Sequence, residues 1–298
     1  MSKAAFVAIT GRPSVGKSTL VNLICKAKVA IVSAVPQTTR NAVRGILTRT
    51  EGQLVFVDTP GRHMSEKKFN KKLMDVSDRV LNDSELVLYV LDASRAPGPE
   101  EEAVANRIKD LQSRTVAAIN KIDAHGAEPK KIRDFLSQSL PDLNRCFEIS
   151  CYRKEGIDAL LNCLFEMAAE GEPFYPEEYY TDQEMTFRVC EIIREKAITR
   201  LREELPHSIY VEVADMEFRD NPETGKKRLW VRAFIITERE SQKGMIVGKG
   251  GEMIKAIGMA ARKELNSIFD WKVELDLRVK TGKDWRHNDR LLKKITGQ

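Results

Sequence analysis

The segment GRPSVGKS at residues 11–18 constrains this chain more than any other stretch. It follows the short apolar run AAFVAIT and precedes a helical pattern, which is the strand–loop–helix setting of a phosphate-binding loop. Glycines let such a loop curl so that its backbone N–H groups point at an anion, and the helix N-terminus adds partial positive charge. The sequence therefore predicts a phosphate site formed by Gly11, Arg12, Pro13, Ser14, Val15, Gly16, Lys17, Ser18 and Thr19.

Short aliphatic runs alternate with amphipathic stretches over residues 4–165. The runs AAFVAIT, QLVFVDT, LVLYVLD, TVAAINK and CFEIS have the length and composition of buried strands. Residues 66–82, 99–112 and 156–168 have helical patterns. This alternation predicts an α/β fold: a parallel P-loop NTPase sheet with flanking helices.

The pattern changes after EGEPFYPEEYYTD, residues 171–183, which we interpret as a linker. A helix is predicted over 184–204, ending at Leu205–Pro206, followed by strands over 208–218 and 228–237. A helix over 241–247, the GKGG loop, a helix over 252–268 and a strand over 271–279 complete the series. We therefore expect two domains, 1–170 and 184–298, of which the second is α+β.

Composition narrows the class of protein. No apolar run reaches the roughly 18 residues that a membrane span needs, and MSKAAFVAIT lacks a cleavage site. The five cysteines (Cys25, Cys146, Cys151, Cys163 and Cys190) show no metal-ligand spacing, so we expect a cytoplasmic protein with reduced thiols. From Lys243 onward the chain has 13 Lys/Arg and 7 Asp/Glu. A polyanionic partner and a solubilising surface explain this excess of positive charge equally well.

Three further segments follow predicted strands and complete a nucleotide site. Asp58 of DTPG can hold Mg²⁺, and the Gly61 N–H can meet a γ-phosphate. Asp123 of NKID can accept hydrogen bonds from the ring N–H and the exocyclic amine of guanine, which adenine does not offer. We therefore predict GTP and GDP as ligands. The predicted contacts beyond the first loop are Asp58, Thr59, Pro60, Gly61, Asn120, Lys121, Asp123, Ser150 and Cys151.

The segment VPQTTRNAV, residues 35–43, lies between the first two motifs. A threonine here can ligate Mg²⁺ when the γ-phosphate is present, which gives a loop ordered by GTP. Thr39 is the predicted ligand beside Ser18 and Asp58, with Thr38 as the alternative. The predicted switch residues are Gln37, Thr38, Thr39, Arg40, Asn41 and Arg62.

These elements in this order resemble Ras-like GTPases of the branch related to translation factors; a P-loop kinase would not need NKID. Arg62 stands where Ras-type enzymes have the glutamine that positions water, and a protonated arginine cannot act as a base. Slow intrinsic hydrolysis is therefore expected. Some relatives hold a catalytic potassium ion with an asparagine where this chain has Ser14, so a monovalent cation is left open.

The later loop GKGG, residues 248–251, is not a second nucleotide site, because no Ser or Thr follows its lysine. The predicted order is helix, strand, strand, then two helices joined by GxxG, and then a strand. This order is typical of a type II KH domain, which clamps single-stranded nucleic acid. Met245, Ile246, Val247 and Ile254 could line its groove or belong to the core. The predicted RNA contacts are Gly248, Lys249, Gly250, Gly251, Lys255 and Arg262.

The combination resembles the Era family, through GRPSVGKST, QTTR, DTPG, NKID, EIIREK, ELP and the VGKGG–IKAIG segment. That resemblance implies a bacterial GTPase whose KH domain binds the 3′ end of 16S-type small-subunit rRNA and which assists maturation of the small ribosomal subunit. It also implies peripheral association with the inner membrane. Two alternatives remain: a nucleotide-sensing RNA-binding adaptor with negligible hydrolysis, and an ATP-dependent RNA enzyme.

Overall fold

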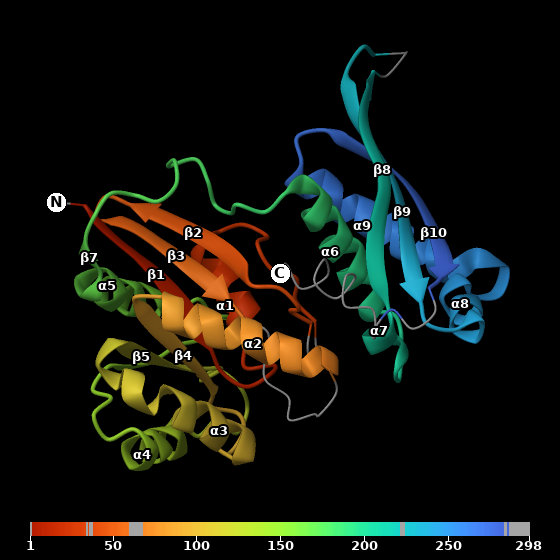
Figure 1. The fold of residues 1–298 in the computed structure, drawn as a ribbon. Coiled ribbons are helices and arrows are strands. Elements are labelled where there is room, and N and C mark those ends of the chain that lie inside the picture. The colour runs from red at the N-terminus through yellow and green to blue at the C-terminus, as the bar shows by residue number, and fades with distance from the viewer. Residues whose placement is uncertain are drawn as a thin grey trace. The chain divides into compact units, whose positions relative to one another are not determined.

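The computed structural model describes residues 2–33, 35, 38–59, 68–220, 224–282 and 285. These residues divide into two compact units (Figure 1). The first unit takes its described residues from 2–32 and 39–182, and the second from 33–38 and 183–285. Four predicted site residues, Gln37, Pro60, Gly61 and Arg62, lie outside the described residues, so their roles stay predictions.

The first unit is built on a mostly parallel sheet in the order β2-β3-β1-β4-β5-β6, with β7 paired to β1. Among the described strands of this unit, only the pairs β2–β3 and β1–β7 are antiparallel. The strands are β1 (Lys3–Thr10), β2 (Val43–Arg49), β3 (Gly52–Asp58), β4 (Leu86–Asp92), β5 (Thr115–Asn120), β6 (Cys146–Glu148) and β7 (Ala169–Glu170). All five predicted strands of this half are confirmed. The sequence analysis missed β2, an edge strand whose arginines and glycine interrupt its apolar run.

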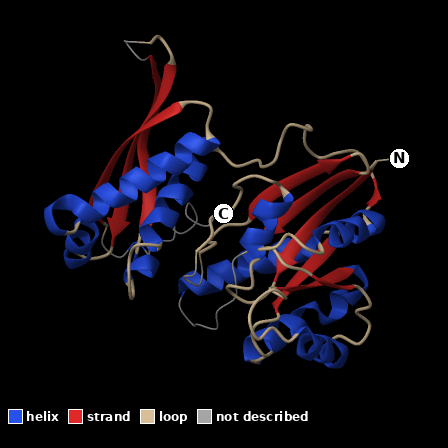
Figure 2. Ribbon diagram, turned by 180° about the vertical axis from the view of Figure 1, so that it is seen from behind, coloured by secondary structure: helices blue, strands red, loops and turns tan. Residues whose placement is uncertain are grey.

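Helices lie on both faces of this sheet (Figure 2). They are α1 (Lys17–Ile24), α2 (Lys68–Asp83), α3 (Pro99–Ile108), α4 (Pro129–Ser139) and α5 (Ile157–Met167), and a 3₁₀ turn, η1 (Lys109–Arg114), follows α3. Tyr89 and Leu91 of β4 join a cluster with buried residues of α2, α3 and α4. The alternate residues Leu88 and Val90 face the other way and are equally buried, so both faces of β4 are covered.

Residues 171–182, here called the strap, fasten onto β2 and β3 of the first unit. The buried Gln53 amide forms two hydrogen bonds with Tyr175 of the strap. Its Nε2 donates to the Tyr175 carbonyl (2.8 Å), and its Oε1 accepts from the Tyr175 N–H (2.9 Å). Farther along, Ile46 N–H donates to the Tyr180 carbonyl (2.9 Å), and Arg44 pairs with Asp182 (2.7 Å). The strap is therefore held along its length by the sheet.

The second unit has a three-stranded sheet in the order β10-β9-β8, in which β9 is antiparallel to β8 and parallel to β10. Its elements are α6 (Met185–Ile198), α7 (Leu205–Ser208), β8 (Tyr210–Asp220), β9 (Lys227–Thr237), α8 (Glu240–Val247), η2 (Lys249–Gly251), α9 (Glu252–Ile268) and β10 (Lys272–Thr281). The predicted order of helix, two strands, two helices and strand is confirmed, with the short α7 added.

The helix predicted over 184–204 is wrong at its C-terminal end, because α6 stops at Ile198. The N–H groups of Arg200 and Leu201 both turn back to the Ala197 carbonyl, which tightens the last turn. Glu203 then takes a left-handed backbone (φ 56°) without the glycine that usually marks such a stop. The sequence therefore carried no signal for the true end.

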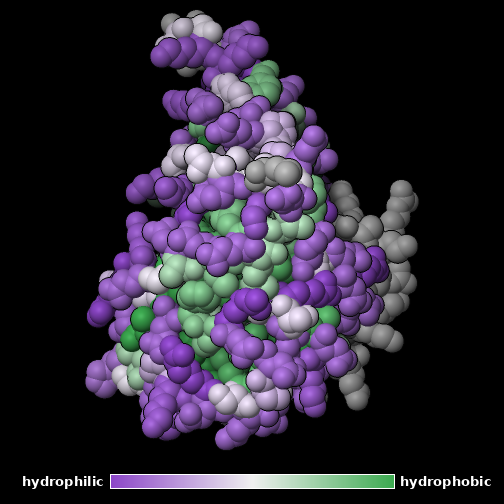
Figure 3. Space-filling view, turned by 90° about the vertical axis from the view of Figure 1, so that its left-hand side faces the viewer, coloured by the Kyte–Doolittle hydropathy of each residue, from purple (hydrophilic) through white to green (hydrophobic). Residues whose placement is uncertain are grey.

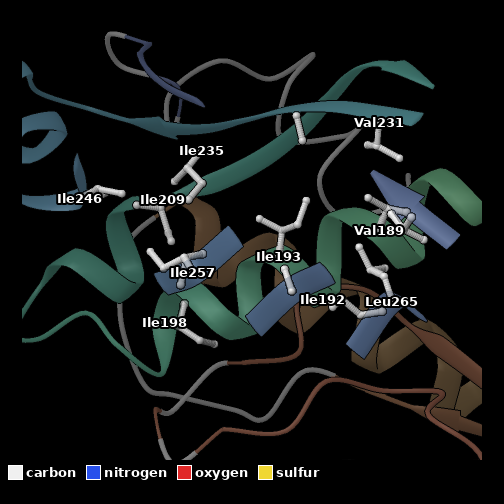
Figure 4. Packing of buried hydrophobic residues seen from close by; sticks show 14 of the residues in the cluster. Val189, Ile192, Ile193, Ile198, Ile209, Val231, Ile235, Ile246, Ile257 and Leu265 are labelled. Carbon is white, nitrogen blue, oxygen red and sulfur yellow. The ribbon is translucent and has the colours of Figure 1, made fainter. Parts of the chain in front are cut away.

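The core of the second unit lies between its helices and its sheet. Ile193 of α6 and Ile257 and Leu265 of α9 pack with Val231 and Ile235 of β9 (Figure 4). All five are fully buried. Because α9 begins directly after the GKGG loop, this packing fixes the direction in which the loop leaves the core.

Hydrophilic residues cover most of the face shown in Figure 3, while hydrophobic residues gather toward its middle. Among the described residues, no helix combines the length and the apolar character that crossing a membrane requires. None of the five cysteines, all of which lie in described segments, forms a disulfide.

We predict that Gln53→Leu lowers the free energy of unfolding by about 2 kcal/mol, because it leaves the Tyr175 N–H and carbonyl without their partners. Urea denaturation measures this change. The matched control is Gln138→Leu on the exposed face of α4, which should leave the midpoint unchanged. Equal midpoints for the two variants would show that the grip on the strap does not stabilise the fold.

Candidate nucleotide and RNA sites

The phosphate-binding loop, residues 11–18, is pressed against the ends of the neighbouring strands. A Cβ on Gly11 would lie 2.3 Å from the Val90 carbonyl oxygen, and one on Gly16 would lie 2.5 Å from Asn120 Nδ2. Both glycines also have positive φ (146° and 104°). No other residue fits either position, so these glycines let the loop lie against β4 and β5.

Lys17 begins α1 and is 7% exposed. Its Nζ donates to the carbonyls of Gly11 (2.9 Å) and Arg12 (3.1 Å), which folds the side chain back over the loop. Burial lowers the pKa of Lys17, while the carboxylates of Asp58 and Glu101 work in the opposite direction. A phosphate group would give this ammonium a stronger partner than two carbonyls do.

The structure brings the three predicted magnesium ligands together. Ser18 Oγ donates to Asp58 Oδ2 (2.6 Å) and lies 3.1 Å from Thr39 Oγ1, and the Thr39 hydroxyl also reaches Asp58 Oδ2 (3.4 Å). Asp58 Oδ1 is buried without a hydrogen-bond partner among the described residues. An orphaned carboxylate oxygen beside two hydroxyls is an all-oxygen donor set, which fits Mg²⁺. Burial raises the pKa of Asp58, and the nearby Lys17 charge opposes this shift.

Asn120 joins the phosphate end of the site to the base end. Its Nδ2 donates to the Val15 carbonyl (2.9 Å), and its Oδ1 accepts from the Cys151 N–H (3.1 Å). Ser150 Oγ donates to Asp123 Oδ1 (2.5 Å), which holds the carboxylate predicted to read guanine. Three predicted segments therefore meet through side-chain contacts. Burial raises the pKa of the Cys151 thiol to about 12, so it stays protonated and neutral.

Lys121 is held by a residue that the sequence analysis missed. Its Nζ pairs with Asp92 Oδ2 (2.7 Å) and donates to the Ser14 carbonyl (2.8 Å). Burial acts to raise the pKa of Asp92, but hydrogen bonds from Lys121 and Ser94 outweigh it and lower the pKa. The available signal was position: Asp92 ends a strand at the same sheet edge as the phosphate loop and NKID.

The remaining residues predicted near the nucleotide divide into buried and exposed groups. Val15, Thr59 and Ser150 are buried, and the Thr59 hydroxyl donates to the Ile9 carbonyl (2.8 Å). Pro13, Ser14 and Thr19 are less buried, and Ser14 has a left-handed backbone (φ 65°).

The described switch residues are well packed. Thr39, Arg40 and Asn41 are buried. Thr38 donates its hydroxyl to the Val35 carbonyl (2.6 Å), and its own carbonyl accepts from Arg194 Nη2 (2.5 Å), a residue of the same compact unit.

The GKGG loop differs from the first loop because its tip is open. Gly248, between α8 and η2, is crowded by Met253, but a Cβ on Gly250 or Gly251 would meet no described atom within 4 Å. Lys249, Lys255 and Arg262 are exposed, and none forms an ion pair with a described residue. Lys249 thus lies in an open loop, and Lys255 and Arg262 follow it on α9.

The apolar residues beside this loop separate into core and surface. Ile246 is fully buried and belongs to the core of the second unit, whereas Met245 is 60% exposed. Val247 and Ile254 are half-buried. Met245 is therefore the best apolar candidate for contact with a ligand, and Ile246 is not one.

Comparison with known proteins agrees with this geometry. A family model described as a 50S ribosome-binding GTPase matches residues 6–121, and a KH-domain model matches residues 204–286. GTPase Era of Treponema denticola is 48% identical over 97% of this chain and 98% of its own length. GTPase Era of Borreliella afzelii is 44% identical over 98% of this chain and 99% of its own. The chain belongs to the Era family of GTPases.

The similarity to a solved structure of an Era family member extends over the whole fold. Era in complex with MgGDPNP and nucleotides 1506–1542 of 16S ribosomal RNA has a TM-score of 0.92 and 33% identity, covering 100% of this chain and 99% of that one. The predicted fold class, a P-loop GTPase sheet followed by a KH domain, is confirmed.

We predict that Asp92→Asn weakens GDP binding about tenfold, because Lys121 loses a charged partner worth about 1.5 kcal/mol. Titration with a fluorescent GDP analogue measures the dissociation constant. Asp134→Asn, an exposed change on α4, is the control and should bind like the wild type. An unchanged constant for Asp92→Asn would mean that the Ser14 carbonyl alone positions Lys121.

Proposed function

We propose that this chain is a GTP-hydrolysing switch that binds single-stranded RNA at the 3′ end of small-subunit rRNA and assists maturation of the small ribosomal subunit. This proposal rests on one observation: a single chain of the Era family combines a guanine-nucleotide site with an open, basic GxxG loop. The named complex of a relative with a 16S rRNA segment supports the choice of RNA.

In the proposed GTPase site, backbone N–H groups of the loop and Lys17 bind the phosphates. Ser18 and Thr39 would hold Mg²⁺ with Asp58 beside them, and the ion would neutralise phosphate charge. Asp123, fixed by Ser150, accepts from guanine. These groups orient the nucleotide and stabilise charge, which is most of what phosphoryl transfer requires of a protein.

Hydrolysis is proposed to be slow without a partner, since Arg62 replaces a water-positioning glutamine. Dependence on a monovalent cation is left open, because Ser14 supplies a hydroxyl where an amide oxygen would serve. Peripheral association with the inner membrane also rests on the family resemblance alone. The domain division at 1–170, 171–183 and 184–298 is proposed with one refinement: the strap belongs with the GTPase domain, supported by its contacts to β2 and β3.

We also propose that nucleotide state is coupled to the KH unit through Thr38 and Thr39. Thr38 binds Arg194 of α6 within the second unit, and the next residue, Thr39, belongs to the proposed magnesium site of the first. A ligand shifts an equilibrium only by binding its states differently. GTP, which is predicted to recruit Thr39, would then favour one arrangement of Thr38 over another.

We predict that Asp123→Asn shifts nucleotide preference from guanosine toward xanthosine nucleotides. The amide donates where the carboxylate accepted, which suits the extra carbonyl of xanthine. Competition titrations with GDP and XDP measure the preference, and Asp134→Asn is the control. If GDP stays preferred over XDP to the wild-type extent, Asp123 does not read the base.

We predict that a short RNA from the 3′ end of small-subunit rRNA raises GTP turnover and that Gly251→Asp abolishes this effect. Aspartate adds negative charge at the loop tip, where an added Cβ meets no described atom. Gly251→Asn, which has the same shape without the charge and tolerates a φ of 82°, is the control and should retain most of the response.

The outcomes of this turnover assay separate the alternatives. No phosphate release above background, with RNA present, would favour the non-enzymatic adaptor. ATP competing equally with GTP would favour an ATP-dependent enzyme. RNA binding without a change in turnover would make the KH loop a tether that is not coupled to hydrolysis.

A further inference from the structure

A buried carboxylate lies directly behind the phosphate-binding loop. Glu101, in the first turn of α3, is 1% exposed, and its Oε2 lies 2.8 Å from Arg12 Nε. Tyr89 of β4, also fully buried, donates its hydroxyl to Glu101 Oε1 (3.0 Å). Glutamate is almost never buried to this degree unless it is paired, so its partners define its role.

The Arg12 side chain is therefore held at α3 by an ion pair. Its side chain is 12% exposed and carries a positive charge. Arg12 is also the second residue of the loop, and its carbonyl accepts from Lys17 Nζ (3.1 Å). Arg12 is therefore held in two ways: Glu101 pairs with its side chain, and Lys17 donates to its backbone carbonyl.

The first half of the loop has a second anchor at Gly11, which lies against the Val90 carbonyl of β4. A phosphate that draws Lys17 away would remove the Lys17 hydrogen bonds to Gly11 and Arg12. The contact with Val90 and the pair with Glu101 do not involve Lys17. The Glu101 pair therefore remains to hold this half of the loop when nucleotide is bound.

We propose that Glu101 is a positioning residue for nucleotide binding: its carboxylate holds the Arg12 guanidinium against α3 and so keeps residues 11–12 in the shape that accepts phosphate. This inference rests on the nucleotide binding of the proposed function. Glu101 acts through Arg12, and the Tyr89 hydroxyl holds the carboxylate in place.

The test is a double-mutant cycle in the full chain, read as dissociation constants for fluorescent GDP and a non-hydrolysable GTP analogue. Removing one partner of a buried ion pair strands the other charge, whereas replacing both leaves a neutral pair. Glu101→Gln and Arg12→Gln should each weaken both nucleotides about tenfold, and the double variant should return to within about threefold of wild type.

Two controls separate positioning from general stability. Glu102→Gln changes an exposed carboxylate in the same helical turn and should bind like wild type. The effect of Glu101→Gln should fall on the KM for GTP, while kcat changes less than about twofold, because saturating GTP fills the site despite weaker binding. Urea midpoints, measured in parallel, report folding separately from affinity.

The proposal is overturned if Glu101→Gln binds both nucleotides like wild type, or if the effects of the two single changes add in the double variant. A lower urea midpoint with unchanged affinity would also overturn it, because the pair would then serve folding alone. If Glu101→Gln does not fold, Tyr89→Phe keeps the ring, removes one hydrogen bond to the carboxylate, and should weaken GDP about threefold. Failure of the wild type to bind either nucleotide would instead contradict the proposed function.

Discussion

The close approach of the phosphate-binding loop to two neighbouring strand ends is the constraint on which the first unit depends. Gly11 touches the Val90 carbonyl of β4, and Gly16 touches Asn120 at the end of β5. Parallel strands bring their carboxyl ends to one edge of the sheet, so segments far apart in sequence meet there. Asn120 then binds Val15 on one side and Cys151 on the other, which joins the phosphate and base ends into one rigid site.

Three cations of this site have partners within the chain. Lys17 donates to two carbonyls, Arg12 forms an ion pair with Glu101, and Lys121 forms one with Asp92. A triphosphate would replace the two carbonyls that bind Lys17, while Glu101 and Asp92 keep their pairs with Arg12 and Lys121. The site therefore exchanges weak neutral acceptors for phosphate while its charged pairs stay in place, which limits the reorganisation that binding requires.

The sequence predicted the parts of this fold that follow from local pattern. Buried aliphatic runs gave β1, β3, β4, β5 and β6, and the order of elements around GKGG gave the KH unit. It did not predict the edge strand β2, the amphipathic α4 or the end of α6, where charged residues or tertiary packing override the pattern. Asp92 and Glu101 were missed for a related reason. Each is an ordinary acidic residue whose partner is set by the fold, and only the place of Asp92 at the end of a strand points toward the site.

The two glycine-rich loops use glycine for opposite steric reasons. In the first, glycine is required because protein atoms already occupy the space where a Cβ would lie. In the second, Gly250 and Gly251 have positive φ, but a Cβ on either would meet no described atom within 4 Å, so the loop tip is open. Lys249 lies at that tip, and Lys255 and Arg262 follow on α9; all three are exposed and have no carboxylate partner among the described residues. Open backbone beside unpaired cations suits a polyanion that approaches closely, which is why we assign this loop to an RNA backbone and not to a second nucleotide.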